Sequence, residues 1–371
     1  MAVQRHRSLV EIDLAAVTAN VQRLLDAAGG AEVWAVVKAN AYGHGAIDVA
    51  HAAIAAGATK LCTATLDEAR AVRVELPTVS LLVLSPLTAG EEAAVAEVGC
   101  AVTVSTLEGW DRLRDHHEVD VHVKVDTGMG RWGLSADEAL AIADQIVSGP
   151  RPERLAGLMS HLATADEADR SFVDQQAEAF RAIAAVFPPC PRHLSNSAAT
   201  LRYPELAFDA VRPGLAVYGI DPLGVSGADC GLLPVMRWSS TVRSLRALAV
   251  GESTGYGRRF VAAEPCRVAL VPIGYADGYP RGLSGLGEVL IRGQRCSVAA
   301  TVSMDQLTVV LPEGLEAKEG DEVVLLGVDG DDLVSAEELA RHVRTVPYEI
   351  ICGVRPRSSV GTVRGCSDST S

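Results

Sequence analysis

The sequence predicts an α/β protein, with an N-terminal (β/α)8 barrel of the TIM type followed by a C-terminal, mainly β domain. Three observations support this prediction. Between about residues 33 and 220, short apolar runs rich in β-branched residues alternate with longer helical patterns, as in a parallel sheet. Eight such alternations fit within about 190 residues, which favours a closed barrel. After Pro222 the long helical patterns nearly vanish while valine, threonine and glycine increase, which is typical of a separate β domain.

Eight short runs are the candidate barrel strands. The first four are continuously apolar, as expected of strands that are covered on both faces. The last two are short and weakly defined, and an open doubly wound sheet remains the alternative arrangement. The runs are Val33–Val37, Lys60–Ala64, Val79–Leu84, Cys100–Val104, Val119–Val125, Leu155–Met159, Arg192–Leu194 and Ala210–Val211.

Helical patterns rich in alanine, glutamate and arginine lie between these runs. One of them begins after Ser135, which forms a capping box with Glu138. The predicted helices are Ala46–Ala56, Asp67–Glu75, Glu91–Val98, Ala136–Val147 and Glu167–Val186.

The second domain is expected to consist of short strands separated by turns that contain glycine and proline. Its candidate strands are Ser240–Val250, Arg267–Ile273, Glu288–Ile291, Ser297–Val302, Leu307–Leu311 and Glu322–Leu326, with one late helix at Ala336–Val343. Asp221–Pro234 is the expected linker. We therefore predict a barrel domain at residues 10–230 and a β domain at 231–371, and residues 1–9 could pack with the latter.

Composition excludes several classes of protein. The 371 residues include 33 basic and 47 acidic side chains, so the net charge of −14 argues against nucleic-acid and anionic-membrane partners. No apolar run is long enough to span a membrane, and the N-terminus has no secretory pattern, so we expect a cytoplasmic protein. The eight cysteines are widely spaced, which predicts small buried side chains and no metal site.

Chemically active residues gather where the predicted barrel strands end. The first strand leads to Lys38, the fifth contains Lys124, the sixth ends at His161, and the last two lead to Ser195–Ser197 and Arg212–Gly214. The active sites of such barrels lie at this end of the strands. Desolvation would lower the pKa of Lys38 and favour a Schiff base or a general base. The alternative is a lysine that snorkels at a strand end, and position alone does not decide between the two.

The segment Gly128–Gly133 matches the G-x-G-x-x-G pattern of dinucleotide-binding sites. That fingerprint requires an acidic residue at the end of the next strand, to hold the ribose. Here the next strand ends in Ser160 and His161, so a dinucleotide site is not favoured. In the β domain, Tyr256 and Tyr275 stand beside glycines, a pattern that tight turns also produce, and Ser303–Gln306 is a further candidate.

Taken together, these segments resemble the alanine racemase family of fold-type III enzymes, which use pyridoxal 5′-phosphate (PLP). The resemblance extends from Glu11–Leu14 to Arg355–Arg357 and implies the fold predicted above. Its motifs stand in order along the chain: Ala35–Gly45, Lys124–Arg131, His161–Asp166, Asn196–Ala199, Val211–Leu215, Tyr256, Pro272–Gly278 and Ser303–Gln306.

The resemblance implies an isomerase that interconverts L-alanine and D-alanine, and so supplies D-alanine for peptidoglycan. Lys38 matches the lysine that binds PLP covalently and then serves as a base on one face of the substrate. Tyr256 matches the base on the opposite face, which the other subunit of a homodimer contributes. A tyrosine pKa near 10 requires nearby positive charge for this role.

Other matched positions surround the cofactor and the substrate. Arg212 matches the residue that faces the pyridine nitrogen, with His161 as its neighbour, and a guanidinium cannot accept a proton from that ring. The ring is then a weaker electron sink, which restrains side reactions. Asn196 belongs to the same cofactor-binding set. The phosphate contacts match Tyr42, Ser197, Gly214, Leu215 and Tyr348.

Arg131 and the backbone of Met304 match contacts to the substrate carboxylate. Tyr275 matches the entrance of the pocket, and Asp305 is a supporting residue. Lys124 matches a lysine that is carbamylated in some relatives. The chain departs from the family at Ala300 and Thr301, where many relatives have Gly-Arg, so local packing or the subunit interface could differ.

Three other functions share parts of this pattern. A racemase that prefers serine would keep the same motifs. A non-catalytic PLP-carrier barrel would keep the lysine but lack the β domain that contains Tyr256. A fold-type III decarboxylase shares the architecture, but its motifs are not found in this chain.

Overall fold

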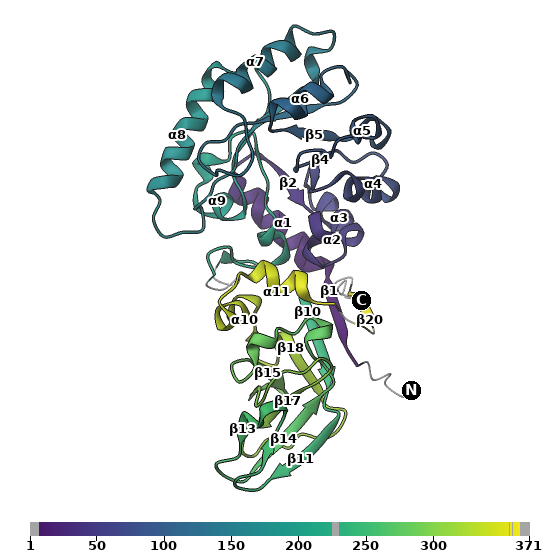
Figure 1. Ribbon diagram of the computed structural model, residues 1–371, viewed down its shortest axis with the longest axis vertical. Helices are drawn as coiled ribbons and strands as arrows, with labels where there is room; N and C mark the ends of the chain where they lie inside the picture. The colour runs from purple at the N-terminus through teal and green to yellow at the C-terminus, as the bar shows by residue number, and fades with distance from the viewer. Residues whose placement is uncertain (1–6, 225–229, 356, 358, 364–371) are drawn as a thin grey trace, which may run out of the picture. The chain divides into compact units, whose positions relative to one another are not determined.

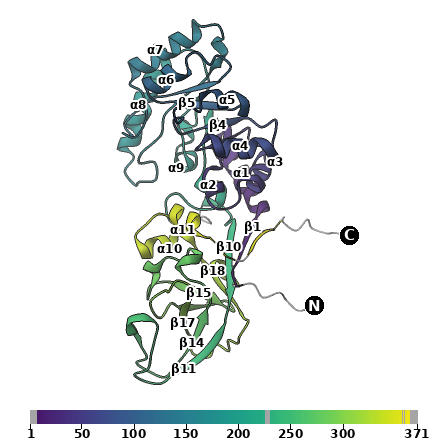
Figure 2. The ribbon, with the colours of Figure 1, turned by 45° about the vertical axis from the view of Figure 1, so that its right-hand side comes forward.

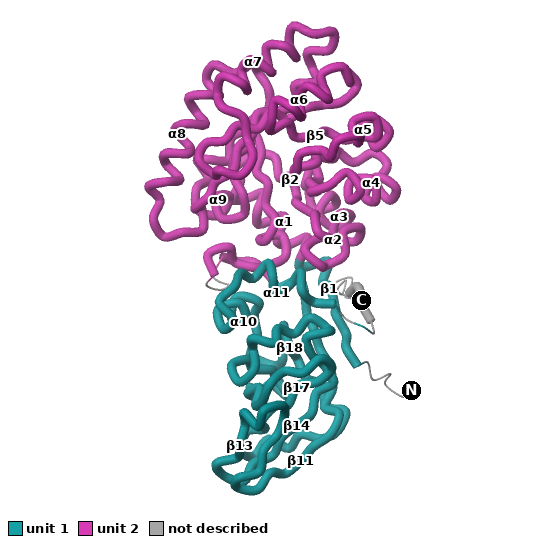
Figure 3. The backbone as a smooth tube through the Cα atoms, in the orientation of Figure 1, with its two compact units in different colours: residues 1–16, 234–371 teal, residues 17–233 magenta. Residues whose placement is uncertain are grey.

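The computed structural model describes residues 7–224, 230–355, 357 and 359–363. The chain divides into two compact units, which Figure 3 shows in different colours: residues 17–233, and residues 1–16 together with 234–371. The sequence predicted a domain boundary between residues 230 and 231, and the boundary between the two units lies between residues 233 and 234. Residues 10–16, which the sequence assigned to the barrel domain, belong instead to the unit of the β domain.

Residues 17–233 contain a closed barrel of eight strands, as predicted. All its strand pairs are parallel, and the first and last strands close the barrel by pairing Glu32 with Ala210 and Val33 with Val211. The strands are β2 (Glu32–Val36), β3 (Lys60–Thr63), β4 (Leu81–Val83), β5 (Ala101–Val104), β6 (Val121–Lys124), β7 (Leu155–Met159), β8 (Arg192–His193) and β9 (Ala210–Val211).

Helices surround these strands in both views of the ribbon (Figure 1, Figure 2). Side-chain caps fix where several of them begin: Thr65 and Ser135 form capping boxes with Glu68 and Glu138, and Thr106 caps a third helix. The helices are α1 (Leu14–Ala28), α2 (Lys38–Tyr42), α3 (Ala46–Ala55), α4 (Leu66–Glu75), α5 (Glu92–Val98), α6 (Leu107–Leu113), α7 (Ala136–Val147), α8 (Ser171–Val186) and α9 (Ser197–Arg202), with 3-10 turns at Pro152–Arg154, Pro204–Leu206 and Leu215–Tyr218.

The β domain contains a large sheet in the order β16-β15-β18-β10-β1-β20, with β19 paired to β18, and two smaller sheets, β11-β14-β17 and β12-β13. Its strands are β1 (Leu9–Asp13), β10 (Met236–Thr241), β11 (Ser244–Leu248), β12 (Ser253–Thr254), β13 (Phe260–Val261), β14 (Cys266–Val271), β15 (Glu288–Ile291), β16 (Gln294–Ser297), β17 (Leu307–Leu311), β18 (Glu322–Asp329), β19 (Asp332–Val334) and β20 (Ser359–Val363). Its helices are α10 (Ala336–Val343), as predicted, and α11 (Pro347–Gly353), with 3-10 turns at Tyr256–Arg258, Tyr275–Asp277 and Arg281–Leu283.

Three predicted elements differ clearly from the structure. The run 240–250 contains two strands of different sheets, β10 and β11, rather than one. Of the run 297–302, only Ser297 belongs to a strand, as the last residue of β16. This strand begins at Gln294, earlier than predicted, because Arg292 and Gly293 both have positive φ and form the tight turn of a hairpin with β15. Helix α8 begins at Ser171, four residues later than predicted, where Asp169 accepts a hydrogen bond from the Ser171 N–H at 2.8 Å.

Strand β1 and helix α1 were not predicted. Strand β1 alternates buried and half-buried residues and pairs antiparallel with β10 and parallel with β20, so its partners come from the far end of the sequence. The Asp13 carboxylate accepts hydrogen bonds from the N–H groups of Ala15 and Ala16, which begins α1. Within the described residues, no helix is both long and apolar enough to cross a membrane.

Candidate active site

A buried arginine organises the carboxyl end of the barrel. Arg212 follows β9 and is 4% exposed. Its Nη1 donates to His193 Nδ1 at 2.6 Å and to the His193 carbonyl at 2.8 Å, and its Nη2 donates to the Ser160 carbonyl at 2.7 Å. Burial lowers the pKa of Arg212 to about 10, so the guanidinium keeps its charge at neutral pH. Among the described residues, no group accepts a hydrogen bond from Arg212 Nε.

His161 lies beside this guanidinium, at the end of β7. Arg212 Nη2 is 3.4 Å from His161 Nδ1. Burial lowers the pKa of His161 to about 3, and the charges of Arg212 and Arg131 add to the effect. His161 is therefore a neutral imidazole whose Nδ1 accepts, because a guanidinium can only donate.

Lys38 begins a strained turn directly after β2. The four residues from Ala39 to Tyr42 have φ between 51° and 53°, in the left-handed region that side chains disfavour. Two side-chain oxygens hold the turn: the Glu68 carboxylate oxygen Oε1 accepts from the Ala39 N–H at 2.8 Å, and the Asn40 amide oxygen Oδ1 accepts from the Ala46 N–H at 2.9 Å. Such strain persists only where surrounding contacts enforce it, and it is typical of functional sites.

The same turn carries Tyr42 to a cluster of backbone N–H groups and hydroxyls. A Cβ at position 214 would stand 2.4 Å from the Tyr42 hydroxyl, so this approach requires Gly214. Ser197 Oγ accepts from the N–H groups of Gly214 and Ala216 at 2.9 and 3.2 Å. Leu215 is 1% exposed, and Asn196 caps α9 by accepting from the Ala199 N–H at 3.1 Å.

Lys124 is the last residue of β6, and Arg131 lies in the loop that follows this strand. Lys124 is 4% exposed and its Nζ donates to the Trp132 carbonyl. Burial lowers the pKa of Lys124 to about 8, an effect that Asp126 opposes and Arg131 reinforces. Arg131 itself is exposed.

The glycines of the Gly128–Gly133 pattern allow this loop to fold closely around Asp126. Asp126 accepts hydrogen bonds from the Gly128 N–H at 2.8 Å and the Gly130 N–H at 2.9 Å. A Cβ at Gly133 would stand 2.5 Å from the Asp126 nitrogen. The N–H groups that would hold a phosphate in a dinucleotide site are therefore occupied by a carboxylate.

In the β domain, Tyr256 lies on an exposed turn and is 75% exposed. Gly255 and Gly257 both have positive φ, and a Cβ at Gly255 would stand 2.5 Å from the Cβ of Ala300. The Thr301 hydroxyl donates to the Tyr256 carbonyl at 3.2 Å. The two residues that depart from the family pattern thus support the turn of Tyr256.

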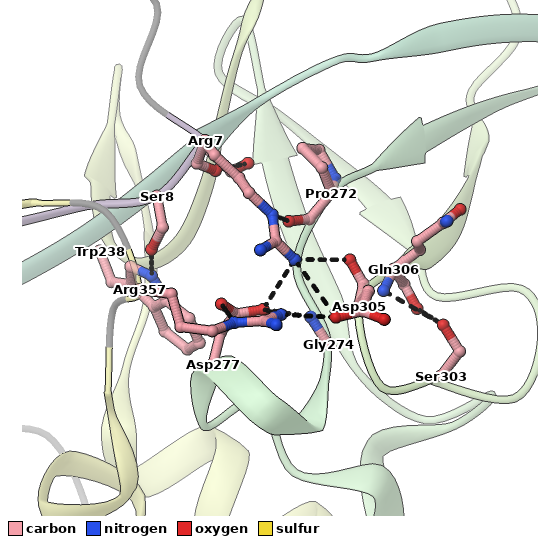
Figure 4. Close-up of polar contacts among 11 residues, drawn as sticks. Arg7, Ser8, Trp238, Pro272, Gly274, Asp277, Ser303, Asp305, Gln306 and Arg357 are labelled. Atoms are coloured by element: carbon pink, nitrogen blue, oxygen red, sulfur yellow. Dashed lines mark hydrogen bonds and ion pairs between the residues drawn. The ribbon is translucent and has the colours of Figure 1, made fainter.

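A buried carboxylate, that of Asp277, forms polar contacts with Arg7 and Arg357 beside the loop of Asp305 (Figure 4). Asp277 is 0% exposed and accepts from Arg357 at 2.7 and 2.9 Å and from Arg7 at 3.3 Å. Arg357 also reaches Asp305 at 2.8 Å. Burial raises the pKa of Asp277, but the hydrogen bonds from Arg357 and the Gly274 N–H, with the charge of Arg7, outweigh it and hold the pKa below its usual value.

The structure thus brings the barrel residues of the predicted site to one end of the barrel, and it holds Tyr275, Met304 and Asp305 in neighbouring loops of the β domain. Tyr348 lies on α11 and is 40% exposed. Its place in a phosphate site, like the role of Tyr256, stays a prediction.

Sequence reasoning missed several supporting residues. His193 and Asp277 both form hydrogen bonds that fix predicted site residues, yet each stands in a short element with no pattern of its own. His193 adjoins the Asn196 motif, and Asp277 lies inside the segment Pro272–Gly278, so proximity to those motifs was the available signal.

Comparison with known proteins follows the same division of the chain. The family model for the alanine racemase N-terminal domain matches residues 12–222, and that for the alanine racemase C-terminal domain matches residues 235–360. The chain belongs to the alanine racemase family.

Alanine racemases of known sequence and structure match nearly the whole chain. The enzyme of Symbiobacterium thermophilum is 40% identical over 357 residues, covering 94% of each chain. The crystal structure of alanine racemase from Streptomyces lavendulae is 36% identical, with a TM-score of 0.91, and the match covers 98% of this chain and 99% of that one. The alanine racemase of Bartonella henselae, 29% identical with a TM-score of 0.86, was crystallised with covalently bound pyridoxal phosphate; the match covers 96% of this chain and 99% of that one.

Proposed function

We propose that the chain is a PLP-dependent alanine racemase that supplies D-alanine for peptidoglycan in the cytoplasm. The observation that supports this most strongly is that both family models match in order, over residues 12–222 and 235–360. The relatives that match nearly the whole chain carry the name alanine racemase, an isomerase.

The residues at the carboxyl end of the barrel fit PLP. A pyridine nitrogen is an acceptor, and Arg212, a side chain that is 4% exposed, has in its Nε a donor that none of the described residues accepts from. A phosphate dianion needs hydroxyl and N–H donors, and Tyr42, Ser197 and the Gly214 backbone converge closely enough that only glycine fits. Asn196, Leu215 and Tyr348 complete the proposed set, and the amine of Lys38 would hold the cofactor covalently.

When bound, the cofactor supplies an electron sink that stabilises negative charge at the α-carbon of alanine. We assign the proton transfers to two residues of this chain. Lys38 Nζ removes or returns the proton on one face of that carbon, and the Tyr256 hydroxyl does so on the other. Two bases are needed because the proton leaves one face and returns to the opposite one. Arg212 donates a hydrogen bond and keeps its own proton, so it does not join the relay.

Substrate binding is assigned to the residues at the mouth of the site. Arg131 and the Met304 N–H would hold the carboxylate of alanine, with Tyr275 at the entrance and Asp305 behind Met304. A pKa of about 8 leaves part of Lys124 as a neutral amine at neutral pH, the form that reacts with carbon dioxide. Carbamylation of Lys124 is therefore part of the proposal.

A homodimer with shared sites is the proposed assembly. Within the single chain, the four assigned residues of the β domain are among its exposed large side chains: Tyr256, Tyr275, Met304 and Tyr348. Exposed aromatic and methionine side chains are typical of interfaces. A second copy of the chain is the proposed source of the barrel that completes each site.

Racemisation of L-alanine and of L-serine by the purified, PLP-loaded protein tests the proposal. We expect conversion of alanine, and its loss by about 10³-fold or more in Lys38→Ala, together with loss of the absorbance of covalently bound PLP. Lys318→Ala is the matched control, because Lys318 is an exposed lysine of the β domain. Conversion of serine in preference to alanine would reassign the substrate, and full activity of Lys38→Ala would overturn the mechanism.

A further inference from the structure

Four side chains are joined by successive polar contacts through the interior of the barrel, and we call this row of contacts the file. Arg212 Nη1 lies 2.6 Å from His193 Nδ1, His193 Nε2 lies 2.8 Å from His122 Nδ1, and His122 Nε2 lies 3.4 Å from Lys60 Nζ. Both imidazoles are 0% exposed. Arg212 directly follows β9, whereas Lys60 is the first residue of β3. Because all barrel strands are parallel, the file connects the carboxyl end of the barrel to its amino end.

The guanidinium fixes the direction of every hydrogen bond in this file. A guanidinium has no acceptor, so His193 Nδ1 accepts and the proton of a neutral His193 resides on Nε2. That proton is donated to His122 Nδ1, and the proton of a neutral His122 therefore resides on Nε2, directed at Lys60. Both imidazoles are neutral, because burial and the nearby cations Arg212 and Lys60 hold their pKa values well below the ordinary one.

An ammonium group at Lys60 would conflict with this order. It carries three donors and no lone pair, so it would face the His122 Nε2–H donor to donor. If it donated to His122 Nε2 instead, the proton of His122 would move to Nδ1 and face the His193 Nε2–H across 2.8 Å. With a neutral amine at Lys60, all three contacts pair a donor with an acceptor.

The surroundings of Lys60 also favour the neutral form. In the part of the chain that the structure describes, no carboxylate oxygen lies within 4 Å of its Nζ. Glu32, the first residue of the neighbouring strand β2, accepts from Thr59 at 2.6 Å and from Trp34 Nε1 at 2.7 Å. The Trp34 ring, 4.1 Å from Nζ, favours an ammonium. Burial nevertheless lowers the pKa of Lys60, against the opposing charges of Cys62, Glu32 and Asp120.

We propose that Lys60 is a neutral amine at neutral pH and the terminal acceptor of this file, so that His193, His122 and Lys60 are positioning residues for Arg212. Their value for catalysis rests on the proposed function, in which Arg212 faces the cofactor, whereas the protonation state of Lys60 does not. The residue type at position 60 fits this role, because an arginine could not lose its proton. Arginine is the usual basic residue of this chain, which has only four lysines among 33 basic residues.

The amine nitrogens can be observed directly by NMR on full-length protein labelled with ¹⁵N at lysine Nζ. Neutral amines and ammonium groups differ in ¹⁵N shift, and the Lys60 signal is identified by its absence in Lys60→Gln. We expect the Lys60 signal to have the neutral shift at pH 7 and to titrate well below Lys318, the exposed reference in the same sample. An ammonium shift for Lys60 at pH 7 would overturn the proposal, whether or not the protein racemises alanine.

Two variants of Lys60 test the positioning role. Gln offers a carbonyl oxygen to His122 Nε2–H, whereas Arg retains the positive charge but forces a donor-to-donor contact. We expect Lys60→Gln to bind PLP within about threefold of the wild type, and Lys60→Arg to bind it about tenfold or more weakly, because a buried donor loses its acceptor. Cofactor fluorescence measures both. If the charge-conserving Arg variant binds PLP as well as or better than the Gln variant, the file does not position Arg212.

If neither variant folds, the NMR titration of the wild type still decides the protonation state of Lys60, because contacts with the Trp34 ring, 4.1 Å from Nζ, then identify its signal. Thermal melting of each variant separates misfolding from a change at the cofactor site. Wild-type protein that shows the predicted Lys60 signal but no racemisation would reject the proposed function and retain the neutral lysine.

Discussion

The two units of the chain hold their site residues in opposite ways. In the barrel, Tyr42, Lys124, Ser197 and Arg212 are all 6% exposed or less, and hydrogen bonds from neighbouring strand ends fix several of them. In the β domain, Tyr256, Tyr275 and Met304 are between 42% and 75% exposed, and their supports act on the backbone of the loops. The assigned residues of the barrel are therefore fixed in a buried surface, whereas those of the β domain are exposed side chains on loops whose backbone is held in place.

Removing the exposed phenol should separate the two halves of the proposed mechanism. Tyr256→Phe deletes one base and leaves the barrel contacts to the cofactor intact. We expect racemisation to fall by about 10²–10⁴-fold in both directions, because each direction needs both bases. The exchange of the α-hydrogen with deuterated water should survive for D-alanine, because the family resemblance assigns that enantiomer to the lysine at position 38, and it should fall sharply for L-alanine. NMR of each enantiomer separately measures this, and equal loss for both with PLP still bound would make Tyr256 a binding residue.

Asp277, with the two arginines that donate to it, forms a brace for the loops of the β domain. We expect this brace to contribute to stability. Asp277→Asn removes the charge that Arg7 and Arg357 share. We expect a loss of about 2–3 kcal/mol in the free energy of unfolding, less than for a fully buried pair because both arginines are partly exposed. Chemical denaturation measures it. Asp174→Asn, which breaks an exposed pair with Arg170, is the control and should change stability by less than about 1 kcal/mol.

The pH dependence of the same variant gives a second test. The pKa of Asp277 is lowered in the folded chain, so its contribution is present above the ordinary carboxyl pKa near 4 and is lost as pH falls through the lowered value. The wild type should therefore lose more stability than Asp277→Asn between about pH 4 and pH 2. Parallel acid curves for the two proteins would show that the brace does not act through this charge.

On the barrel side, the anchor of Arg131 is a buried amine. Lys124→Met removes the hydrogen bond to the Trp132 carbonyl, next to Arg131. We expect KM for alanine to rise about tenfold with kcat changed by less than about threefold, since the loop then holds the carboxylate contact less firmly. Steady-state kinetics checks this. An unchanged KM would show either that Arg131 does not bind the substrate or that Lys124 does not fix the position of the loop that contains Arg131.

The smallest effect is expected where this chain departs from its family. Thr301→Val removes one hydrogen bond to the Tyr256 carbonyl. We expect kcat to fall about two- to fivefold, in keeping with one exposed hydrogen bond. Thr308→Val, on β17, is the control and should leave kcat unchanged. A larger drop for the control than for Thr301→Val would remove the assigned link between Thr301 and Tyr256.

The sequence predicted elements best where local pattern determines structure. The strands Leu155–Met159 and Glu288–Ile291 and the helix Ala136–Val147 have the same bounds as predicted, since continuous apolar runs and the capping box of Ser135 act locally. The structure confirms the barrel and the mainly β second domain. Three of the cysteines, Cys62, Cys100 and Cys296, are buried, whereas Cys366 lies outside the described residues.

What the sequence did not reveal depends on contacts between distant residues. Strand β1 exists because β10 and β20 pair with it, and Asp277 is a brace because Arg7 and Arg357 reach it from both ends of the chain. The file from Arg212 to Lys60 likewise joins Arg212 to three strand residues that share no sequence pattern with it. The assigned roles of the individual site residues stay predictions.

The central claim is that the buried barrel half and the exposed β-domain half of each site come from different chains. Mixing Lys38→Ala with Tyr256→Phe subunits, each inactive alone, tests it most directly after subunit exchange is verified by mass spectrometry. Because one site of each mixed dimer would contain both Lys38 and Tyr256, we expect activity to return to about a quarter of the wild-type level at equal amounts. No activity in verified mixed dimers would contradict the claim and show that each chain builds its own site.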